Sequence, residues 1–586
     1  MAGLEDPLDV QCVADAARDQ LSNILSEVDG PKDVVIQADL MSLLNHVTPF
    51  SFLKKLGVDH VFKLEPTMNM GGTHRYYITR PDLHAVSQIA THIVSDHNDQ
   101  QQRDYCIIFV PRQLASCESI LEAEGVYGFV RILEWNLHLI PLDAHLLSLE
   151  RYDTFRSLYV SQDFTHLHSI ARSLLLLEGL FGTFPLVHGK GHFAQMVWDL
   201  FKRLKELGDT PSFGQLSEQG ISEVVLFDRQ CDLITPLCSQ LTYEGILDDV
   251  FRIQSGYVEI SSDITQKEQE TKVLLNSKDP VFTEIRSLHF SATSLILTEI
   301  SKNLRHTYRE GKSHDSIPAL KSFVKRLPEL TKKHDSLATH VQVSEHIMAK
   351  KKREDFQRQL FYERAILEGA DKTSVTDYIE ELIQCQADYR LPLRLLCLMS
   401  ITNNGIKDKY LSSLKDQYLR SYGHKHLVTF HNLQRVGLIQ HKAEEQTPHK
   451  STFKLLTKQL KLVPKDPSLY DIYSPKDMSY VYGGAYKPLS CAAIEHIVKT
   501  RTWRGLDDVV RSWKGPAFSH PQHTSRDAAL AAHQKIVLVY FIGGCTFSEI
   551  NALRFLGEKT NTNYLIATTN IINPNTLIES VVFSED

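Results

Sequence analysis

The order of strand-like and helix-like segments constrains this chain more than any single motif does. A short apolar run at residues 223–227 is typical of a buried strand, and the next comparable runs come only at 535–542 and 563–568. Residues 245–473, which lie between them, are mostly helical in pattern. If strands on the two sides pair in one sheet, the ends of this stretch lie close together. We therefore predict an α/β domain that is interrupted by a long helical insertion.

The first third of the chain predicts another α/β unit. Strand-like apolar runs lie at 32–40, 76–79, 104–111 and 130–132. Residues 85–95 carry apolar side chains at helical spacing, and two more amphipathic helices are expected at 166–181 and 192–207. Strands that alternate with helices indicate a largely parallel sheet covered on both faces.

Within the predicted insertion, apolar residues recur at helical spacing between residues 320 and 348. They form one stripe in two parts, Leu320, Phe323, Val324 and Leu327, then Leu337, Val341 and Met348. Pro328 interrupts this stripe and predicts a kink or hinge, because proline removes a backbone donor and clashes with the preceding turn. Further helices are expected at 375–384, 391–401 and 407–421, followed by a polar, flexible loop at 440–451.

The bulk composition predicts a multidomain cytosolic protein. A length of 586 residues suits three or four domains. The 64 basic and 71 acidic residues give a net charge of −7, so nucleic acid and anionic membrane are not expected as general partners. We expect neither a secretory signal nor a membrane span, because no apolar run reaches about 18 residues. Nine cysteines without a CxxC pair suit reduced thiols.

A carboxylate-rich segment allows an enzymatic interpretation. Asp228, Arg229 and Asp232 follow the run at 223–227, and α/β enzymes often place active sites at such strand ends. Paired carboxylates there could bind magnesium. We favour the alternative, in which these charges form ion pairs and hydrogen bonds that fix a domain junction, because no further metal ligands are apparent in the sequence.

The glycine turn after the run at 535–542 also has two interpretations. Gly543 and Gly544 could cradle a phosphate, although they match neither the dinucleotide fingerprint nor the P-loop. We favour a tight turn, with Thr546 as the N-cap of a helix and Glu549 completing a capping box. The segment 188–192, with histidines flanking two glycines, is likewise expected to be a turn. The sequence thus indicates no catalytic residue, metal site or cofactor.

Three motifs, taken in order, resemble the Sec/Munc-type (SM) family, whose members chaperone SNARE assembly. The motifs are Asp228-Arg229-x-x-Asp232-x-x-Thr235-Pro236-Leu237, Tyr480-Val481-Tyr482-Gly483-Gly484 and Gly543-Gly544-x-Thr546-x-x-Glu549-Ile550. Each motif is weak alone, but their order and spacing together are specific. The resemblance covers nearly the whole chain.

The resemblance implies an arch-shaped fold of three domains with parallel sheets flanked by helices. The domains expected are an N-terminal α/β domain at 1–145, a discontinuous central α/β domain at 146–244 and 477–586, and a helical insert at 245–476. Within the insert, we expect a hairpin at about 280–370 and a partner-docking part at about 371–476.

The resemblance also implies a SNARE-binding factor, not an enzyme, that acts in vesicle trafficking and fusion on the endosomal and lysosomal pathway. Its hairpin would hold partner helices in register and so lower the ordering cost of their assembly. The hairpin residues expected to contact SNAREs are Pro328, Leu337, Val341 and Met348. Such a protein would be cytoplasmic, held by its partners on late endosomes, lysosomes or recycling endosomes.

A second surface is implied around residues 422–427, where vacuolar members of the family dock onto a helical-repeat subunit. The contact residues expected are Lys415, Tyr422, His424 and Leu427. The implied partner is a subunit related to vacuolar protein sorting-associated protein 16, with Rab GTPases of recycling or late endosomes as further partners. Alternatively, Tyr422 and Leu427 pack the helical core, and their exposure would distinguish the two.

A rival function from another class is a nucleotide- or phosphate-binding α/β enzyme. It would use Asp228, Asp232 and the Gly543-Gly544 turn. Because a ligand that binds only the folded state stabilises it, this rival predicts a higher unfolding temperature with nucleotide or metal.

Overall fold

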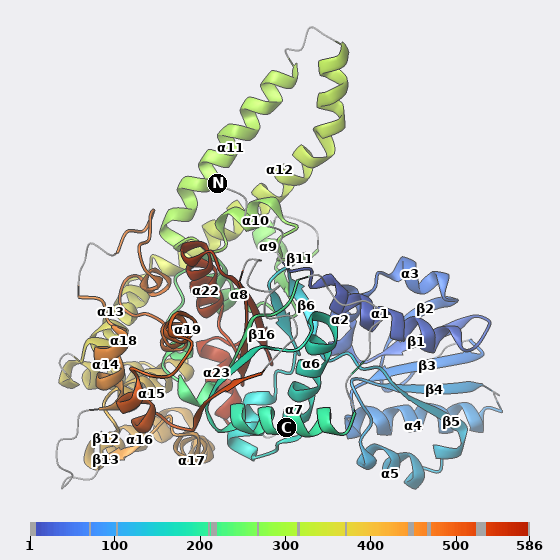
Figure 1. The fold of residues 1–586 in the computed structure, drawn as a ribbon, viewed down its shortest axis with the longest axis horizontal. Helices are drawn as coiled ribbons and strands as arrows, with labels where there is room; N and C mark the ends of the chain where they lie inside the picture. Colours follow the sequence, from blue (N-terminus) through green and yellow to red (C-terminus); the bar gives the residue numbers. More distant parts are fainter. Residues whose placement is uncertain are drawn as a thin grey trace.

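The computed structural model describes residues 8–68, 72–100, 103–208, 211, 219–265, 269–312, 317–369, 372–442, 451–465, 470–522 and 535–583. Two large β-sheets with their flanking helices, together with a helical region, make up this part of the chain (Figure 1). Helices α13 to α18 and the N-terminal sheet lie on opposite sides of the larger sheet. The predicted α/β class with a helical insertion is confirmed.

The N-terminal sheet has five parallel strands. Their order is β2 (Val58–Lys63), β1 (Lys32–Ile36), β3 (His74–Thr79), β4 (Asp104–Phe109) and β5 (Val130–Glu134). The helices of this region are α1 (Gln11–Ser26), α2 (Ala38–Val47), α3 (Phe50–Lys55), α4 (Leu83–Asn98) and α5 (Ala115–Ala123). The strand predicted at 32–40 is shorter than expected, because Leu40, Leu43 and Leu44 continue the apolar pattern at helical spacing and bury one face of α2.

The larger sheet contains strands from both sides of the insertion. Its order is β14 (Ala517–Pro521), β8 (Leu186–Lys190), β9 (Glu223–Asp228), β15 (Ile536–Ile542), β16 (Asn563–Thr568), β7 (Leu146–Ser148) and β6 (Ile140–Asp143). Strands β9 and β15 are parallel neighbours, with Val225 opposite Val539. Strands far apart in sequence therefore pair, as predicted, and the residues between them form an insertion.

Helices cover this central sheet, and short turns connect its strands. The helices are α6 (Thr165–Phe181), α7 (His192–Glu206), α19 (Leu489–Thr500), α20 (Asp507–Ser512), α22 (Phe547–Thr560) and α23 (Pro574–Val581). A π-helix spans Arg156–Ser161, and 3-10 turns span Tyr127–Phe129, Arg229–Cys231, Thr235–Leu237 and Met478–Tyr482.

Two segments near the predicted boundaries and turns can be located in the structure. Strand β6 lies within the predicted N-terminal domain of residues 1–145 but pairs in the central sheet. The segment 188–192 was predicted to be a turn, but residues 188–190 belong to strand β8, in which His188 and Lys190 are buried. The chain turns at Gly191, which has a φ of 111°. Lys190 is buried because its Nζ donates to the carbonyls of Trp513 and Gly515.

The insertion is helical apart from two small pairs of strands. Its helices are α8 (Tyr243–Phe251), α9 (Ser262–Thr265), α10 (Pro280–Ile285), α11 (Phe290–Lys312), α12 (Ile317–Lys351), α13 (Glu354–Glu368), α14 (Lys372–Gln384), α15 (Arg390–Thr402), α16 (Asp408–Tyr422), α17 (His426–Val436) and α18 (Thr452–Leu460). The strand pairs are β10 (Tyr257–Ile260) with β11 (Thr271–Leu274), and β12 (Ile406–Lys407) with β13 (His441–Lys442). Of the loop predicted at 440–451, residues 443–450 lie outside the described residues.

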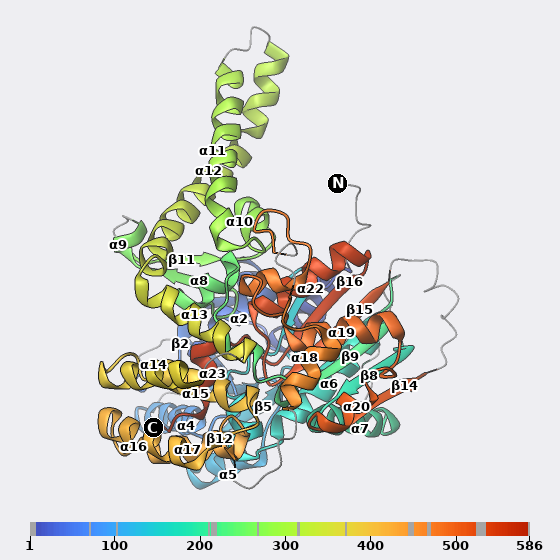
Figure 2. The same ribbon diagram turned by 90° about the vertical axis from the view of Figure 1, so that its left-hand side faces the viewer.

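Helices α11 and α12 form a hairpin that extends away from the rest of the molecule (Figures 1 and 2). Pro328 lies inside α12, which is continuous in this structure on both sides of the proline. The Pro328 side chain is exposed, and proline removes one backbone hydrogen-bond donor from the helix at this position.

Candidate functional site

A buried cluster of charged and polar groups lies where β9 and β15 end. Arg229 is 0% exposed, and its Nη1 donates to both carboxylate oxygens of Glu549, at 2.9 and 2.8 Å. Its Nε donates to the carbonyl of Asp232 at 2.9 Å. Burial opposes the charge of Arg229, but Glu549 and Asp232 outweigh burial and hold its pKa above the ordinary value.

Every carboxylate in this cluster already accepts hydrogen bonds from the protein. Asp232 accepts from the Thr235 hydroxyl at 2.6 Å and from the Ser490 amide at 2.9 Å. Asp228 accepts from the Tyr159 hydroxyl at 2.6 Å and from the Phe193 amide at 2.9 Å. Burial raises the pKa of both aspartates. The described residues contain no group of three or more histidines, cysteines or carboxylates that could hold a metal ion.

The glycine turn is built as the capping-box interpretation predicted. The Glu549 amide donates to the Thr546 hydroxyl at 3.1 Å, and the Thr546 amide donates to the Glu549 carboxylate at 2.9 Å. Gly543 and Gly544 have φ values of 95° and 108°, a region that favours glycine. A Cβ at Gly544 would lie 2.6 Å from Ile572, so the turn also has no room for a side chain.

The same turn is poorly suited to hold a phosphate. Its first helical amides are engaged, since Ser548 donates to the Gln240 side chain at 2.9 Å and Glu549 donates to Thr546. Cys545 is buried, and burial raises the pKa of its thiol, which leaves it unsuited to act as a nucleophile. Ser490 follows the second of the three family motifs, within a Pro488-Leu489-Ser490 segment that also resembles the family, whereas Tyr159 was not predicted because it lies far from the other members in sequence.

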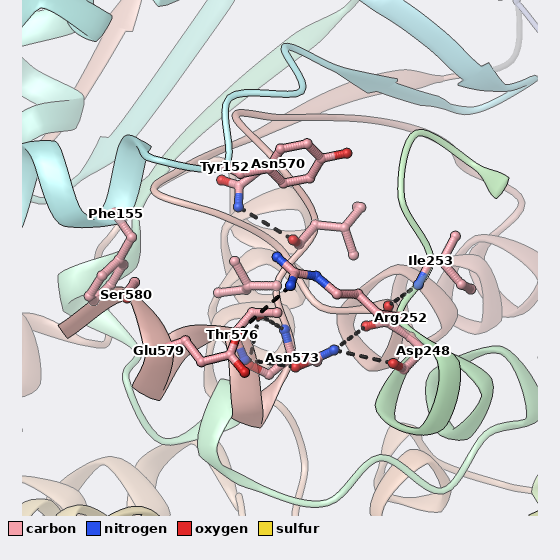
Figure 3. A pocket seen from close by; sticks show the side chains of 12 residues that line it. Tyr152, Phe155, Asp248, Arg252, Ile253, Asn570, Asn573, Thr576, Glu579 and Ser580 are labelled. Atoms are coloured by element: carbon pink, nitrogen blue, oxygen red, sulfur yellow. Dashed lines mark hydrogen bonds and ion pairs between the residues drawn. The ribbon is translucent and has the colours of Figure 1, made fainter. Parts of the chain in front are cut away.

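A small pocket marks the junction between the start of the insertion and the end of the chain (Figure 3). It encloses about 200 Å³ and is lined by α8 and by the segment that leads into α23. The side-chain amide of Asn573 donates to the Asp248 carboxylate at 3.1 Å and to its backbone carbonyl at 3.3 Å. Burial and the neighbouring Asp249 raise the pKa of Asp248 to about 7. These bonds tie the insertion to the central domain.

The hairpin stripe expected to contact partner helices faces inward over part of its length. Leu337 is only 8% exposed, and Val341 and Met348 are half-buried against the core. They are covered because the lower part of α12 packs on α10 and α8. The assignment of Leu337, Val341 and Met348 as SNARE contacts stays a prediction, and in this structure these side chains are largely covered. Pro328 is exposed.

Three apolar residues of the hairpin are accessible to solvent. Val324 and Leu327 on α12 are 55% and 38% exposed, and Leu295 on α11 is also exposed. Val324 and Leu327 belong to the stripe seen in the sequence, but its spacing did not indicate which part of the stripe the core would cover. The part of α12 that projects furthest lies beside α11 in the hairpin (Figure 1).

An apolar groove of about 610 Å³ lies at the base of the hairpin. Its lining includes Ile246, Phe290, Met348, the exposed Phe361 and Tyr482. The groove thus joins the end of α12 and the start of α13 to the central domain. An apolar groove beside exposed apolar helices is a common arrangement for binding an amphipathic helix.

His289, in the wall of this groove, gives a testable pH dependence. The Ser291 amide donates to its Nδ1 at 3.2 Å, and burial lowers the pKa of His289 to about 4. In the unfolded chain this imidazole takes up a proton below about pH 6.5. The stability that the neutral ring contributes is therefore present above pH 6.5 and is lost as the pH falls toward 4.

We expect His289→Asn to reduce this loss. Asparagine can accept the same amide hydrogen bond but does not titrate. Between pH 7.5 and 5, the variant should lose about 2 kcal/mol less stability than the unsubstituted protein, as measured by denaturant unfolding at both pH values. Equal losses of stability in the variant and in the unsubstituted protein would show that His289 does not cause this pH dependence.

The predicted docking segment has one packed side and one exposed side. The Tyr422 hydroxyl donates to the Ala387 carbonyl at 2.7 Å, and its ring lies 4.6 Å from that of Tyr418. Lys415 is half-buried, with Nζ 5.9 Å from the centre of the Phe430 ring. His424 is exposed, and Leu427 is 53% exposed. Tyr422 thus anchors α16, and Leu427 lies on the surface.

The fold and these features can be compared with known proteins. The sequence matches the family model described as the Sec1 family over residues 32–580. The chain belongs to the Sec1 family. The resemblance to Sec/Munc-type proteins is thereby confirmed, and the buried cluster around Arg229 contains residues of the first and third motifs that carried it.

Two relatives illustrate the position of the chain within the Sec1 family. Vacuolar protein sorting-associated protein 33B of Homo sapiens is 39% identical, over 96% of this chain and 96% of that protein. Vacuolar protein sorting-associated protein 33A of Rattus norvegicus is 32% identical, over 98% of each chain. Segments 17–21 and 38–42 of the sequence predict greater similarity to the B form, and these identities agree.

A solved structure of an SM protein has the same fold. The SM protein Vps45 in complex with the Qa SNARE Tlg2 has a TM-score of 0.64 at 15% identity and covers 98% of each chain. The arch-shaped SM fold expected from the sequence is confirmed by this likeness. Among the residues that the structure describes, no helix combines the length and apolarity needed to cross a membrane.

Proposed function

We propose that this Sec1-family protein binds SNARE helices and templates or regulates their assembly in vesicle trafficking and fusion along the endosomal and lysosomal pathway. The observation that carries the proposal is the projecting α11–α12 hairpin, with exposed apolar residues above an apolar groove. The vacuolar sorting names of the relatives and the SNARE in the Vps45 structure support the pathway and the partner class.

The physical basis is the exposed apolar surface of the hairpin. Val324, Leu327 and Leu295 lie in water in the unbound protein, and burying each side chain under a partner helix would contribute up to about 1.5–3 kcal/mol. Because α11 and α12 are already folded, they would present these side chains in fixed positions. A preformed surface lowers the ordering cost for partner helices that are disordered when free.

We expect the double variant Val324→Asp with Leu327→Asp to weaken SNARE binding at least about tenfold. The carboxylates replace apolar surface at positions where a partner helix would exclude water. Binding would be measured by pull-down and by titration with a purified endosomal SNARE bundle. Asn303→Asp is the matched control, because it adds a charge at an exposed polar position on the same hairpin.

Two results would count against the proposal. One is the failure of the unsubstituted protein to bind any endosomal SNARE bundle, alone or with its partner subunit. The other is equal weakening by Asn303→Asp and by the apolar substitutions, since a general charge effect would then explain the loss.

We further propose that the exposed side of α16 and α17 docks a helical subunit related to vacuolar protein sorting-associated protein 16. Leu427 and Val428 expose apolar surface at the start of α17, and the exposed His424 lies three residues before Leu427. This partner, together with Rab GTPases, would hold the protein peripherally on late endosomes, lysosomes or recycling endosomes.

The rival enzymatic function is disfavoured because the carboxylates and amides that it needs already take part in hydrogen bonds within the protein. Nucleotides with magnesium should therefore not raise the unfolding temperature.

A further inference from the structure

A pocket of about 650 Å³ lies beside α18, away from the hairpin and from the α16–α17 surface. The ends of α13 and α15 form one part of its lining, and α18 with residues 461–465 forms the other. Lys487 closes one side. Pockets of roughly 300–1,000 Å³ are of the size that encloses a small ligand or a few side chains.

The rim of this lysine pocket carries an excess of positive charge. Lys454, Lys458, Lys461 and Lys465 line it and are all exposed. Within the described part of the chain, none of these four ammonium groups has an ion-pair or hydrogen-bond partner. Lys487 differs, because its ammonium group pairs with Asp477.

The like charges of the rim lysines repel one another, so their mutual interaction does not stabilise the fold. Lys454 and Lys458 are four residues apart on one helix, a spacing at which like charges destabilise by about 0.2–0.5 kcal/mol. The acidic residue of the lining, Glu368, accepts from the Arg364 guanidinium at 2.7 Å and is already paired. An anion from outside would therefore relieve the repulsion.

The floor of the lysine pocket is apolar. Ile366, Leu367 and Phe453 are buried residues that line it, and the half-buried Val463 and Pro464 continue the surface. The hydroxyl oxygen of Thr457 is buried in the lining without a hydrogen-bond partner in the structure. A ligand that fits must therefore offer both apolar surface and negative charge.

We infer that the lysine pocket binds a short acidic segment of a partner protein, with one apolar side chain on the floor and carboxylates on the lysine rim. A fully polar phosphorylated headgroup would satisfy the lysines but would place polar groups against the apolar side chains that line the floor. The whole chain carries a net charge of −7, which repels an acidic segment in general, whereas the positive rim would attract one locally to this site.

The test uses a fluorescein-labelled peptide of glutamates and aspartates around a central phenylalanine, titrated against the full chain by anisotropy. We expect binding that weakens with salt, and at least about a tenfold loss with Lys458→Glu plus Lys461→Glu. Replacing the phenylalanine of the peptide by serine should also weaken binding several-fold. Lys302→Glu plus Lys325→Glu, at exposed positions on the hairpin, is the matched control and should bind normally.

Three outcomes would overturn the inference. They are no binding of the peptide, equal binding to the lysine-pocket variant and the unsubstituted protein, and equal binding of the serine peptide. Inositol hexakisphosphate or phosphoinositide vesicles that bind in a Lys458-dependent manner, without peptide binding, would assign the site to a phosphorylated ligand instead. Thermal unfolding of each variant verifies that the fold is retained, because the substituted side chains are exposed.

Discussion

Replacing Arg229 with methionine is expected to lower the free energy of unfolding by about 3–5 kcal/mol, or to prevent the protein from folding. Methionine fills much of the space but leaves Glu549 and Asp232 without their counter-charge in a site closed to water. Glu549 also caps α22 through Thr546, so the loss would extend to the turn that follows β15. Denaturant and thermal unfolding of the full chain would measure the change.

Arg358→Met is the matched control for this prediction. Arg358 pairs with Glu381 at 2.7 Å, but both side chains are exposed, at 40% and 47%. Ion pairs at such exposed positions contribute about 0–1 kcal/mol, so the control should unfold almost as the unsubstituted protein does. If the two variants lost similar amounts of unfolding free energy, burial would not explain the contribution of the Arg229 ion pairs to stability.

Replacing Leu427 with aspartate is expected to weaken binding of the sorting 16-related subunit at least about thirtyfold without unfolding the protein. Leu427 is 53% exposed on α17, beside the exposed Val428, so a carboxylate there is solvated in the free protein. In a closed apolar interface it would lose that solvation, and central contacts of this kind contribute about 2 kcal/mol or more. Binding would be measured by titration and co-purification.

Leu433→Asp separates docking from folding. Leu433 lies on the same helix but is fully buried, so its substitution should unfold the helical region, as seen by circular dichroism. Unfolding by Leu427→Asp as well would show that Leu427 supports the core. A folded Leu427→Asp protein that binds its partner normally would remove Leu427 from the docking surface.

Local patterns predicted much of the fold correctly. The strands β9 and β15 were evident as apolar runs, and the capping box at Thr546 and Glu549 was evident from residue types three positions apart. The strand at 32–40 was predicted too long because apolar residues continue from β1 into the buried face of α2. Strands β8 and β14 were missed, since glycine and histidine in β8 are typical of turns when seen alone.

The candidate surfaces were harder to predict than the elements that carry them. Helical spacing identified one apolar stripe on α12, but burial by α10 and α8 divides it into a covered part at Leu337 and an exposed part at Val324 and Leu327. The lysine pocket was not predicted at all. Its rim comes from α18 and residues 461–465, whereas Leu367 in its floor comes from α13, much earlier in the chain.

The sequence by itself determined that an α/β domain is interrupted by a helical insertion, because strand and helix periodicity and helix capping depend on neighbouring residues. It also determined the charged motif around Arg229 and the family it belongs to. Only the tertiary structure decided which charges of that motif pair, which side of α12 is covered, and that Tyr422 is packed whereas Leu427 is exposed. Those properties depend on segments far apart in the chain, and pairing and burial arise only when such segments meet.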